Sequence, residues 1–232
     1  MKLAVAEYFA SIQGEGKHAG RSAVFVRLGG CNLKCVWCDS IKVWRRGETY
    51  NPIVFADLIV DMFHRQFESG AMLVITGGEP LIPAYHQSLI EFLNRLTAQL
   101  GFHPFVEVET NGTYEPDPNL NALISSYACS PKLKNSGMPR DKRITPALAF
   151  FANCRKAFFK FVVKDWADVV ETLTDFVIPF NIAPDRVWLM PCADNEEELR
   201  LVAPEVVRWA LRLGFNYSDR LQIRIWNQTT GV

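Results

Sequence analysis

Short apolar runs alternate with longer amphipathic segments along most of the chain. The apolar runs predict strands at residues 23–27, 72–76, 105–109, 127–130, 158–163, 187–190 and 221–226. Apolar residues at helical spacing predict helices over 54–67, 83–100, 166–175 and 195–213, the last capped by Asp194 and kinked or broken at Pro204. Strands that alternate with helices are typical of βαβ units, so we expect an α/β fold with a mainly parallel sheet.

The composition indicates a single domain. The chain has 232 residues, of which 49% are hydrophobic, and this is enough to bury one large core. Lys and Arg together number 25, as do Asp and Glu, so no global charge draws the protein to nucleic acid or to an anionic membrane. No apolar run reaches the roughly 18 residues of a membrane span. We therefore expect a cytoplasmic protein with no membrane partner and no direct nucleic-acid partner. The polar segment 134–143 predicts a mobile loop over one end.

Three of the six cysteines lie within eight residues, in the segment GGCNLKCVWCDS at 29–40. A closed structural zinc site needs four ligands, and none of the four histidines has a partner at ligand spacing. A 4Fe–4S cluster can be held by three thiolates if a non-protein ligand completes the fourth iron. Zinc and a chance grouping of structural cysteines stay open as alternatives. The other cysteines are isolated and expected in the core: Cys129, Cys154 and Cys192.

Two glycine-containing segments are candidate ligand loops. TGGEP at 76–80 follows a strand, and its glycines let a small zwitterion approach exposed backbone groups. In SIQGEG at 11–16, Gln13 and Glu15 present the donors and acceptors that a guanine-like or pterin ring edge demands. An ordinary βα turn and a polar hairpin turn are the alternative interpretations.

Arg27 ends an apolar strand on the same face as Ala23 and Phe25. If that face points into a barrel, the guanidinium must find an anion or several acceptors there, such as a substrate carboxylate. If the face points outward, Arg27 is a surface charge.

The CxxxCxxC spacing resembles the signature of the radical S-adenosylmethionine (SAM) superfamily, in which SAM chelates the open iron. With SIQGEG, GRSAVFVRLGGCNLKCVWCDS, ITGGEP, VETNGT, CSPK and RLQIRIW, the chain closely resembles the 7-carboxy-7-deazaguanine synthase family. The resemblance implies a partial (β/α) barrel of the radical SAM type, forming one core domain over 1–232. It places the cluster loop at 29–40 and a terminal strand and tail at 221–232 that close the active site. The implied reaction is ring contraction of 6-carboxy-5,6,7,8-tetrahydropterin to 7-carboxy-7-deazaguanine with loss of ammonia, in 7-deazapurine biosynthesis such as that of queuosine.

The resemblance also implies cofactors, partners and site residues. The 4Fe–4S cluster is expected on Cys31, Cys35 and Cys38, and Mg²⁺ on Ser40. SAM is expected against Trp37, Cys38, Asp39, Gly77, Gly78, Glu79, Ser130, Pro131 and Lys132. The pterin substrate is expected against Ile12, Gln13, Gly14, Glu15, Arg27, Thr76 and Val232. The implied partners are an electron donor such as flavodoxin or ferredoxin and a second copy of the chain in a homodimer.

Two other functions remain compatible with the cysteine motif. A glycyl-radical activating enzyme uses the same cluster motif but acts on a protein backbone, for which nothing like SIQGEG is required. A zinc-stabilised binding module is the non-enzymatic alternative, and metal analysis after anaerobic purification separates it from a cluster-bearing enzyme.

Overall fold

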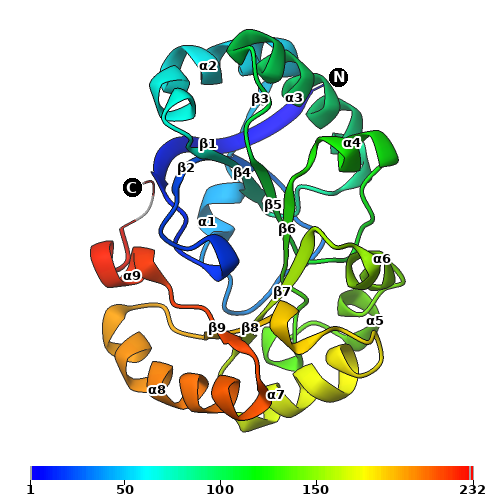
Figure 1. Ribbon diagram of the computed structural model, residues 1–232, viewed down its shortest axis with the longest axis vertical. Helices are drawn as coiled ribbons and strands as arrows, with labels where there is room; N and C mark the ends of the chain where they lie inside the picture. The colour runs from blue at the N-terminus through cyan, green and yellow to red at the C-terminus, as the bar shows by residue number, and fades with distance from the viewer. Residues whose placement is uncertain (1, 230, 232) are drawn as a thin grey trace.

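One curved sheet organises the protein. The computed structural model describes residues 2–229 and Gly231, and within them nine strands form this sheet in the order β3-β1-β2-β4-β5-β6-β7-β8-β9 (Figure 1). The strands are β1 Leu3–Ile12, β2 Ser22–Leu28, β3 Glu48–Tyr50, β4 Met72–Gly77, β5 Val106–Thr110, β6 Ser126–Cys129, β7 Ala157–Val163, β8 Val187–Pro191 and β9 Asn216–Tyr217.

The sheet is mainly parallel, as predicted. From β2 through β4 to β9, each strand pairs in parallel with the next one in the sheet. β1 pairs antiparallel with β2 on one side and with β3 on the other. The prediction of a single α/β domain built as a partial barrel is therefore confirmed. The sequence pattern did not predict β1 or β3.

The prediction of a final strand at 221–226 is wrong. This segment is the short helix α9, Leu221–Trp226, and the last strand is β9. The sequence LQIRIW alternates like a strand, but only Ile223 is buried, while Ile225 is 55% exposed. A helical turn fits this pattern because it buries one face of the segment against the domain.

Helices α2 to α8 lie around the outer, convex side of the sheet, whereas α1 lies inside its arc (Figure 1). The helices are α1 Ile41–Trp44, α2 Pro52–Glu68, α3 His86–Leu100, α4 Pro118–Leu123, α5 Arg140–Arg143, α6 Ala147–Asn153, α7 Trp166–Glu171, α8 Glu196–Leu213 and α9. The Asn51 side chain accepts hydrogen bonds from the first turn of α2, and Gly101 ends α3 with a left-handed φ of 76°.

Helix α8 differs from the prediction in two details. Its N-cap is Asn195, whose side chain accepts from the Glu198 amide, and not Asp194. The helix also continues through Pro204 to Leu213 without a break. Pro204 is exposed, so water can satisfy the carbonyl group that loses its helical hydrogen bond there.

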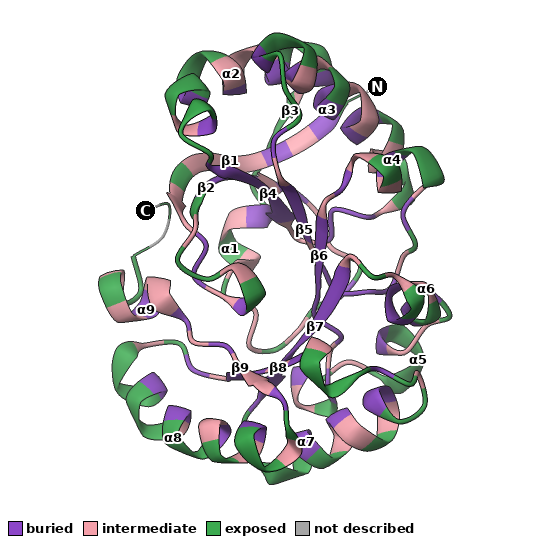
Figure 2. Cartoon of the chain, in the orientation of Figure 1, coloured by how far each residue is buried: buried purple, intermediate pink, exposed green. Residues whose placement is uncertain are grey.

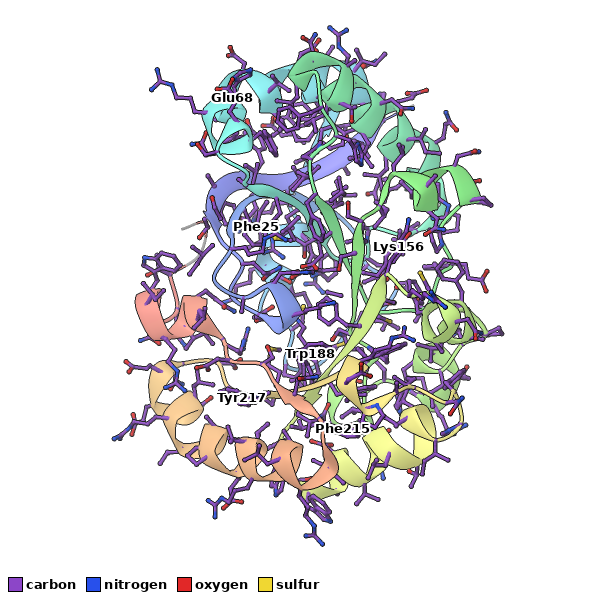
Figure 3. The ribbon with its side chains drawn as sticks, viewed as in Figure 1. Phe25, Glu68, Lys156, Trp188, Phe215 and Tyr217 are labelled. Carbon is purple, nitrogen blue, oxygen red and sulfur yellow. The ribbon has the colours of Figure 1, made fainter. Side chains whose placement is uncertain are left out.

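The two faces of the sheet bury different kinds of side chain. Val24, Val26 and Leu28 of β2 join the large apolar core between the sheet and the outer helices. Ala23 and Phe25 point the other way, into a small inner cluster with Met72 and Val74, and Phe25 lies inside the arc of the sheet (Figure 3). Figure 2 shows the central strands β4 to β8 largely buried between these layers.

The segment predicted as a mobile loop, 134–143, forms a short turn followed by α5 and is anchored to the domain. Arg143 is only 5% exposed and is paired with Glu171 at 2.5 Å. Among the described residues, no helix has the length and apolar character that crossing a bilayer demands.

Candidate functional site

A cavity of about 760 Å³ lies at the carboxyl ends of the parallel strands, where ligand sites of such folds form. The SIQGEG segment, the cluster loop and the turn after β4 all contribute to its wall. The predicted site residues that line it are Ile12, Gln13, Gly14, Glu15, Arg27, Cys31, Cys35, Trp37, Cys38, Asp39, Ser40, Thr76, Gly77, Gly78, Ser130 and Lys132. Segments that are distant in the sequence therefore converge on one space.

The three clustered cysteines are free thiols on the cavity wall. Cys31, Cys35 and Cys38 are all half-buried, and burial raises the pKa of the Cys31 thiol to about 11. A backbone hydrogen bond of 3.3 Å from the Cys38 amide to the Cys35 carbonyl closes the turn between the last two. Among the described residues, no three His, Cys, Asp or Glu side chains converge as ligands of a single ion. Thiols spread along a wall fit a polynuclear cluster, in which each thiolate binds a different iron.

Residues 135–138 pack against the cluster loop and hold its shape. The Val36 amide donates to the Ser136 carbonyl at 3.0 Å, and the Trp37 indole nitrogen donates to the Asn135 side chain at 3.1 Å. Lys132 lies over the Trp37 ring, 5.5 Å from its centroid, and donates to the Ser130 hydroxyl at 3.0 Å. This arrangement leaves an ammonium group and a hydroxyl at the cavity beside the cluster loop.

Gly77 and Gly78 bring the turn after β4 close to the cluster loop. A Cβ on Gly78 would lie 1.9 Å from the Gly30 carbonyl oxygen, and one on Gly77 would lie 2.3 Å from the Leu28 oxygen. The residue after Gly78 is hydrogen-bonded to the cluster loop, since the Glu79 amide donates to the Gly30 carbonyl at 2.9 Å. The glycines are therefore required by close backbone packing, besides leaving the cavity wall open.

Glu79 and Pro131, predicted to contact SAM, are buried and do not line the cavity. The Glu79 carboxylate accepts hydrogen bonds from the backbone amides of Leu81 and Asn111 and from the Thr110 hydroxyl. Burial nevertheless raises its pKa above the ordinary value. Glu79 thus fixes the ends of β4 and β5 relative to each other.

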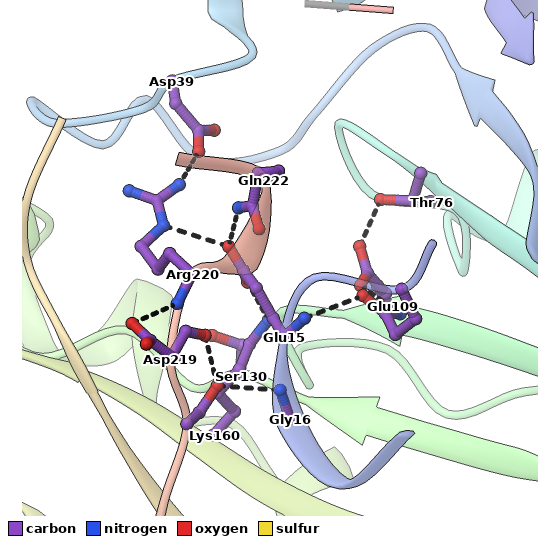
Figure 4. A network of polar contacts seen from close by, with 12 residues as sticks. Glu15, Gly16, Asp39, Thr76, Glu109, Ser130, Lys160, Asp219, Arg220 and Gln222 are labelled. Atoms are coloured by element: carbon purple, nitrogen blue, oxygen red, sulfur yellow. Dashed lines mark hydrogen bonds and ion pairs between the residues drawn. The ribbon is translucent and has the colours of Figure 1, made fainter. Parts of the chain in front are cut away.

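Glu15 is the centre of a charged network at the cavity (Figure 4). One carboxylate oxygen pairs with Lys160, and the other accepts from Arg220 at 3.0 Å and from Gln222 at 2.6 Å. Burial alone would raise the pKa of Glu15, but the Lys160 and Arg220 charges outweigh it and hold that pKa far below the ordinary value of 4.5. Glu15 is therefore a carboxylate at neutral pH.

Gln13 and Thr76 are tied to a second group of carboxylates on β5. The Gln13 amide nitrogen donates to Glu107 at 3.1 Å and to Glu109 at 3.2 Å. The Thr76 hydroxyl donates to the other oxygen of Glu109 at 2.7 Å. Glu109 lines the cavity, whereas Glu107 is fully buried below it and also pairs with His18.

Arg27 points into the barrel, on the same face of β2 as Phe25, so the inward of the two interpretations of this residue applies. Its Nε donates to Glu7 at 2.7 Å, and both side chains line the cavity. Ser40 also lies on the wall, with its hydroxyl 3.7 Å from the Cys38 sulfur. Val232 lies outside the described residues, but Thr229 and Gly231 just before it line the same cavity.

Several charged and amide groups of the cavity wall were not predicted from the sequence, among them Glu7, Glu109, Lys160, Arg220 and Gln222. Lys160 and Glu109 each interrupt an apolar strand, which is a signal that could have identified them. Gln222 was hidden by the wrong strand assignment of 221–226, and Arg220 directly precedes that segment. Cys129 is buried as expected, but Cys154 and Cys192 are only half-buried, and Cys192 lines the cavity because it follows β8 directly.

Comparison with known proteins agrees with this geometry. Residues 12–114 match a family described as a 4Fe-4S single cluster domain. The chain is 38% identical to a 7-carboxy-7-deazaguanine synthase of Pyrobaculum aerophilum, across 99% of this chain and 97% of that protein. It is 35% identical to the one of Halobacterium salinarum, across 97% and 91%.

A solved structure has the same fold. The crystal structure of QueE from Escherichia coli matches with a TM-score of 0.65 and 24% identity, across 94% of each chain. The fold, the cluster-domain match and near-complete alignment with these relatives agree, and the chain belongs to the 7-carboxy-7-deazaguanine synthase family.

Proposed function

We propose that this protein is a radical SAM lyase that contracts 6-carboxy-5,6,7,8-tetrahydropterin to 7-carboxy-7-deazaguanine and releases ammonia, in 7-deazapurine biosynthesis of the queuosine type. One observation carries the proposal: three free thiols and a set of buried, paired charges line the same cavity. Family membership favours this reaction over a glycyl-radical activating enzyme and a zinc-stabilised module.

The cofactors are assigned to the side of the cavity that carries the thiols. Cys31, Cys35 and Cys38 would hold a 4Fe–4S cluster, and Trp37, Asp39, Gly77, Gly78, Ser130 and Lys132 would border SAM. When bound, the cluster and SAM supply the one-electron chemistry that starts the ring contraction. The protein orients both groups and keeps water away from the reacting atoms.

The substrate is assigned to the side that carries the charges. Arg27 offers a guanidinium whose outer nitrogens can bind the substrate carboxylate, while Glu7 accepts from its Nε. The carboxyl oxygens of Glu15 and Glu109 are acceptors suited to the amino and ring N–H groups of a pterin. Gln13 and Thr76 hold Glu109 in place through their hydrogen bonds.

Anaerobic incubation of the iron-reconstituted protein with dithionite, SAM, Mg²⁺ and 6-carboxytetrahydropterin tests the proposal. We expect 7-carboxy-7-deazaguanine by mass spectrometry and about four irons per chain. Cys38→Ala should lose both the cluster and the product, whereas Cys154→Ala should retain both because Cys154 does not line the cavity. A zinc-loaded wild-type protein without product would contradict the proposal.

We also propose that Mg²⁺ binds at Ser40, since a hydroxyl, substrate oxygens and waters suit a hard cation. Ser40→Ala should then raise the Mg²⁺ concentration needed for half-maximal turnover without loss of the cluster. An unchanged Mg²⁺ titration would remove Ser40 from the site. A flavodoxin or ferredoxin as reductant, a homodimer and a cytoplasmic location complete the proposal.

The placement of Val232 against the substrate stays a prediction, supported by the cavity contacts of Thr229 and Gly231. Residues appended after Val232 should weaken turnover and leave SAM binding intact. Unimpaired kinetics of an extended chain would contradict this placement.

A further inference from the structure

Arg220 joins three segments that belong to different parts of the cavity wall, and Figure 4 shows two of these links, to Glu15 and to Asp39. Arg220 is the residue just before α9, and its side chain is 9% exposed. Nε donates to Glu15 at 3.0 Å, Nη2 to Asp39 at 2.5 Å, and Nη1 to the Ala193 carbonyl at 2.5 Å. Each of the three guanidinium nitrogens thus serves a different segment.

The three segments that Arg220 contacts have different roles in the proposed function. Glu15 belongs to the segment that faces the substrate, Asp39 directly follows the cluster ligand Cys38, and Ala193 lies beyond the end of β8. Only a planar fork with several fixed donors can hold three such acceptors at once. A lysine at this position has one charged nitrogen and can replace only part of the set.

The charges around Arg220 show which of its contacts can be replaced. Glu15 keeps Lys160 and Gln222 as partners if Arg220 is removed, so its ionisation has a second support. Asp39 has Arg220 as its ion-pair partner and is itself 59% exposed. Removal of the guanidinium therefore breaks the link between Asp39 of the cluster loop and Glu15. Glu15 itself stays charged, because Lys160 still pairs with it.

We infer that Arg220 is a positioning residue that holds the cluster loop, through Asp39, in register with the substrate-binding carboxylate Glu15. This inference rests on the proposed function. It assigns Arg220 no contact with the reacting atoms. Its consequence is that SAM cleavage and substrate turnover depend on each other through this side chain.

Arg220→Gln tests the inference. We expect the iron content and the SAM affinity, measured by calorimetry, to stay at the wild-type level. The KM for the pterin should rise about 10- to 100-fold, the effect of losing charged hydrogen bonds. SAM should be cleaved without matching product, so that more 5′-deoxyadenosine forms per product than in the wild type.

Arg220→Lys separates charge from geometry. It keeps a cation beside Glu15 but cannot also span to Asp39 and the Ala193 carbonyl. We expect a KM closer to the wild-type value than that of Arg220→Gln, with the excess of 5′-deoxyadenosine still present. Asp39→Asn, which weakens the other end of the link, should produce a similar excess with the smaller change in KM.

Two matched arginines serve as controls. Arg224 lies four residues further along the chain, within α9, pairs with Asp219 at 2.9 Å and does not line the cavity, so Arg224→Gln should retain wild-type kinetics. Arg186 donates to four backbone carbonyls away from the cavity, so Arg186→Gln should lower the melting temperature without producing excess 5′-deoxyadenosine.

The outcomes distinguish the inference from the proposed function. If the wild type makes the product and Arg220→Gln retains its KM and its product per SAM cleaved, the inference is overturned. It is also overturned if Arg220→Gln loses activity only in proportion to its loss of stability, as Arg186→Gln does. A wild-type protein that binds the cluster and makes no product contradicts the proposed function instead.

Discussion

The outer and inner faces of the curved sheet are built on different principles. On β2, the outward-facing Val24, Val26 and Leu28 enter a continuous apolar core under the helices. On the same strand, Phe25 and Arg27 face inward, where the apolar cluster is small and charged groups follow it toward the cavity. The outer face thus supplies most of the stability through the burial of apolar surface, while the inner face holds charged groups, which lose part of their hydration there.

The largest expected effect comes from opening the outer core. Phe92 is fully buried and stacks on Phe55 at a ring separation of 5.4 Å. Phe92→Ala should lower the free energy of unfolding by about 3–5 kcal/mol, because it removes apolar contacts and leaves a cavity. Denaturant titration measures this loss. The KM for the pterin should not change. An increase in this KM would show that the outer core also affects substrate binding, and would contradict the separation of roles between the two faces.

A smaller loss of stability is expected when the inner face loses one charge. Lys160 is 6% exposed and pairs with Glu15. Lys160→Met should lower the free energy of unfolding by about 1–3 kcal/mol, since Arg220 and Gln222 still serve the carboxylate. Unlike Phe92→Ala, it should also raise the KM for the pterin. Wild-type kinetics in Lys160→Met would show that the inner charges are structural.

The charged inner face should make the stability of the protein depend on pH. The folded-state pKa of Glu15 is held far below 4.5 although burial opposes this, because Lys160 and Arg220 favour the carboxylate. Its contribution to stability is therefore complete above the unfolded-state pKa and is lost as the pH falls toward the folded-state value. Between about pH 3 and 5, the free energy of unfolding should rise more steeply with pH in the wild type than in Glu15→Gln. Parallel curves from denaturant titrations would contradict the assigned direction.

The smallest effect is expected at the solvent-exposed surface of α2. His64 and Glu68 form an exposed i,i+4 pair with 3.3 Å between their atoms. Glu68→Gln should change the free energy of unfolding by no more than about 0.5 kcal/mol and leave turnover unaffected. If Glu68→Gln lowered the free energy of unfolding as much as Lys160→Met does, solvent exposure would not explain which ion pairs contribute little to stability.

The outer face was predictable from the sequence, and the inner face only in part. β4 is apolar from Met72 to Ile75, and β7 is apolar except for Lys160, because helices and the barrel interior bury both sides of these strands. β1 was missed because Glu7 interrupts its apolar pattern. Glu7 faces inward and accepts a hydrogen bond from Arg27, so a polar residue of the cavity interrupted the pattern that would have predicted the strand.

The candidate site was predictable where short motifs carry it. The cysteine loop and Gly77–Gly78 need particular residues at fixed spacing, and the structure brings both to one cavity. The pairing of Arg220 and Lys160 with Glu15 was not predictable in the same way, because Glu15 lies 205 and 145 positions away from them along the chain. Local pattern cannot report such pairing, and the period-two alternation of 221–226 pointed to the wrong element.

The contact between Arg220 and Asp39 spans 181 positions of the sequence, which has a consequence for synthesis on the ribosome. At about 5–20 residues per second, roughly 10–35 seconds separate the appearance of the cysteine loop from that of the arginine that anchors it. During this interval the nascent thiols lack one wall of their site and are open to oxidation or to other metals. Delivery of iron and sulfide is therefore best timed after release of the finished chain, and slow translation of the second half should favour a misloaded protein.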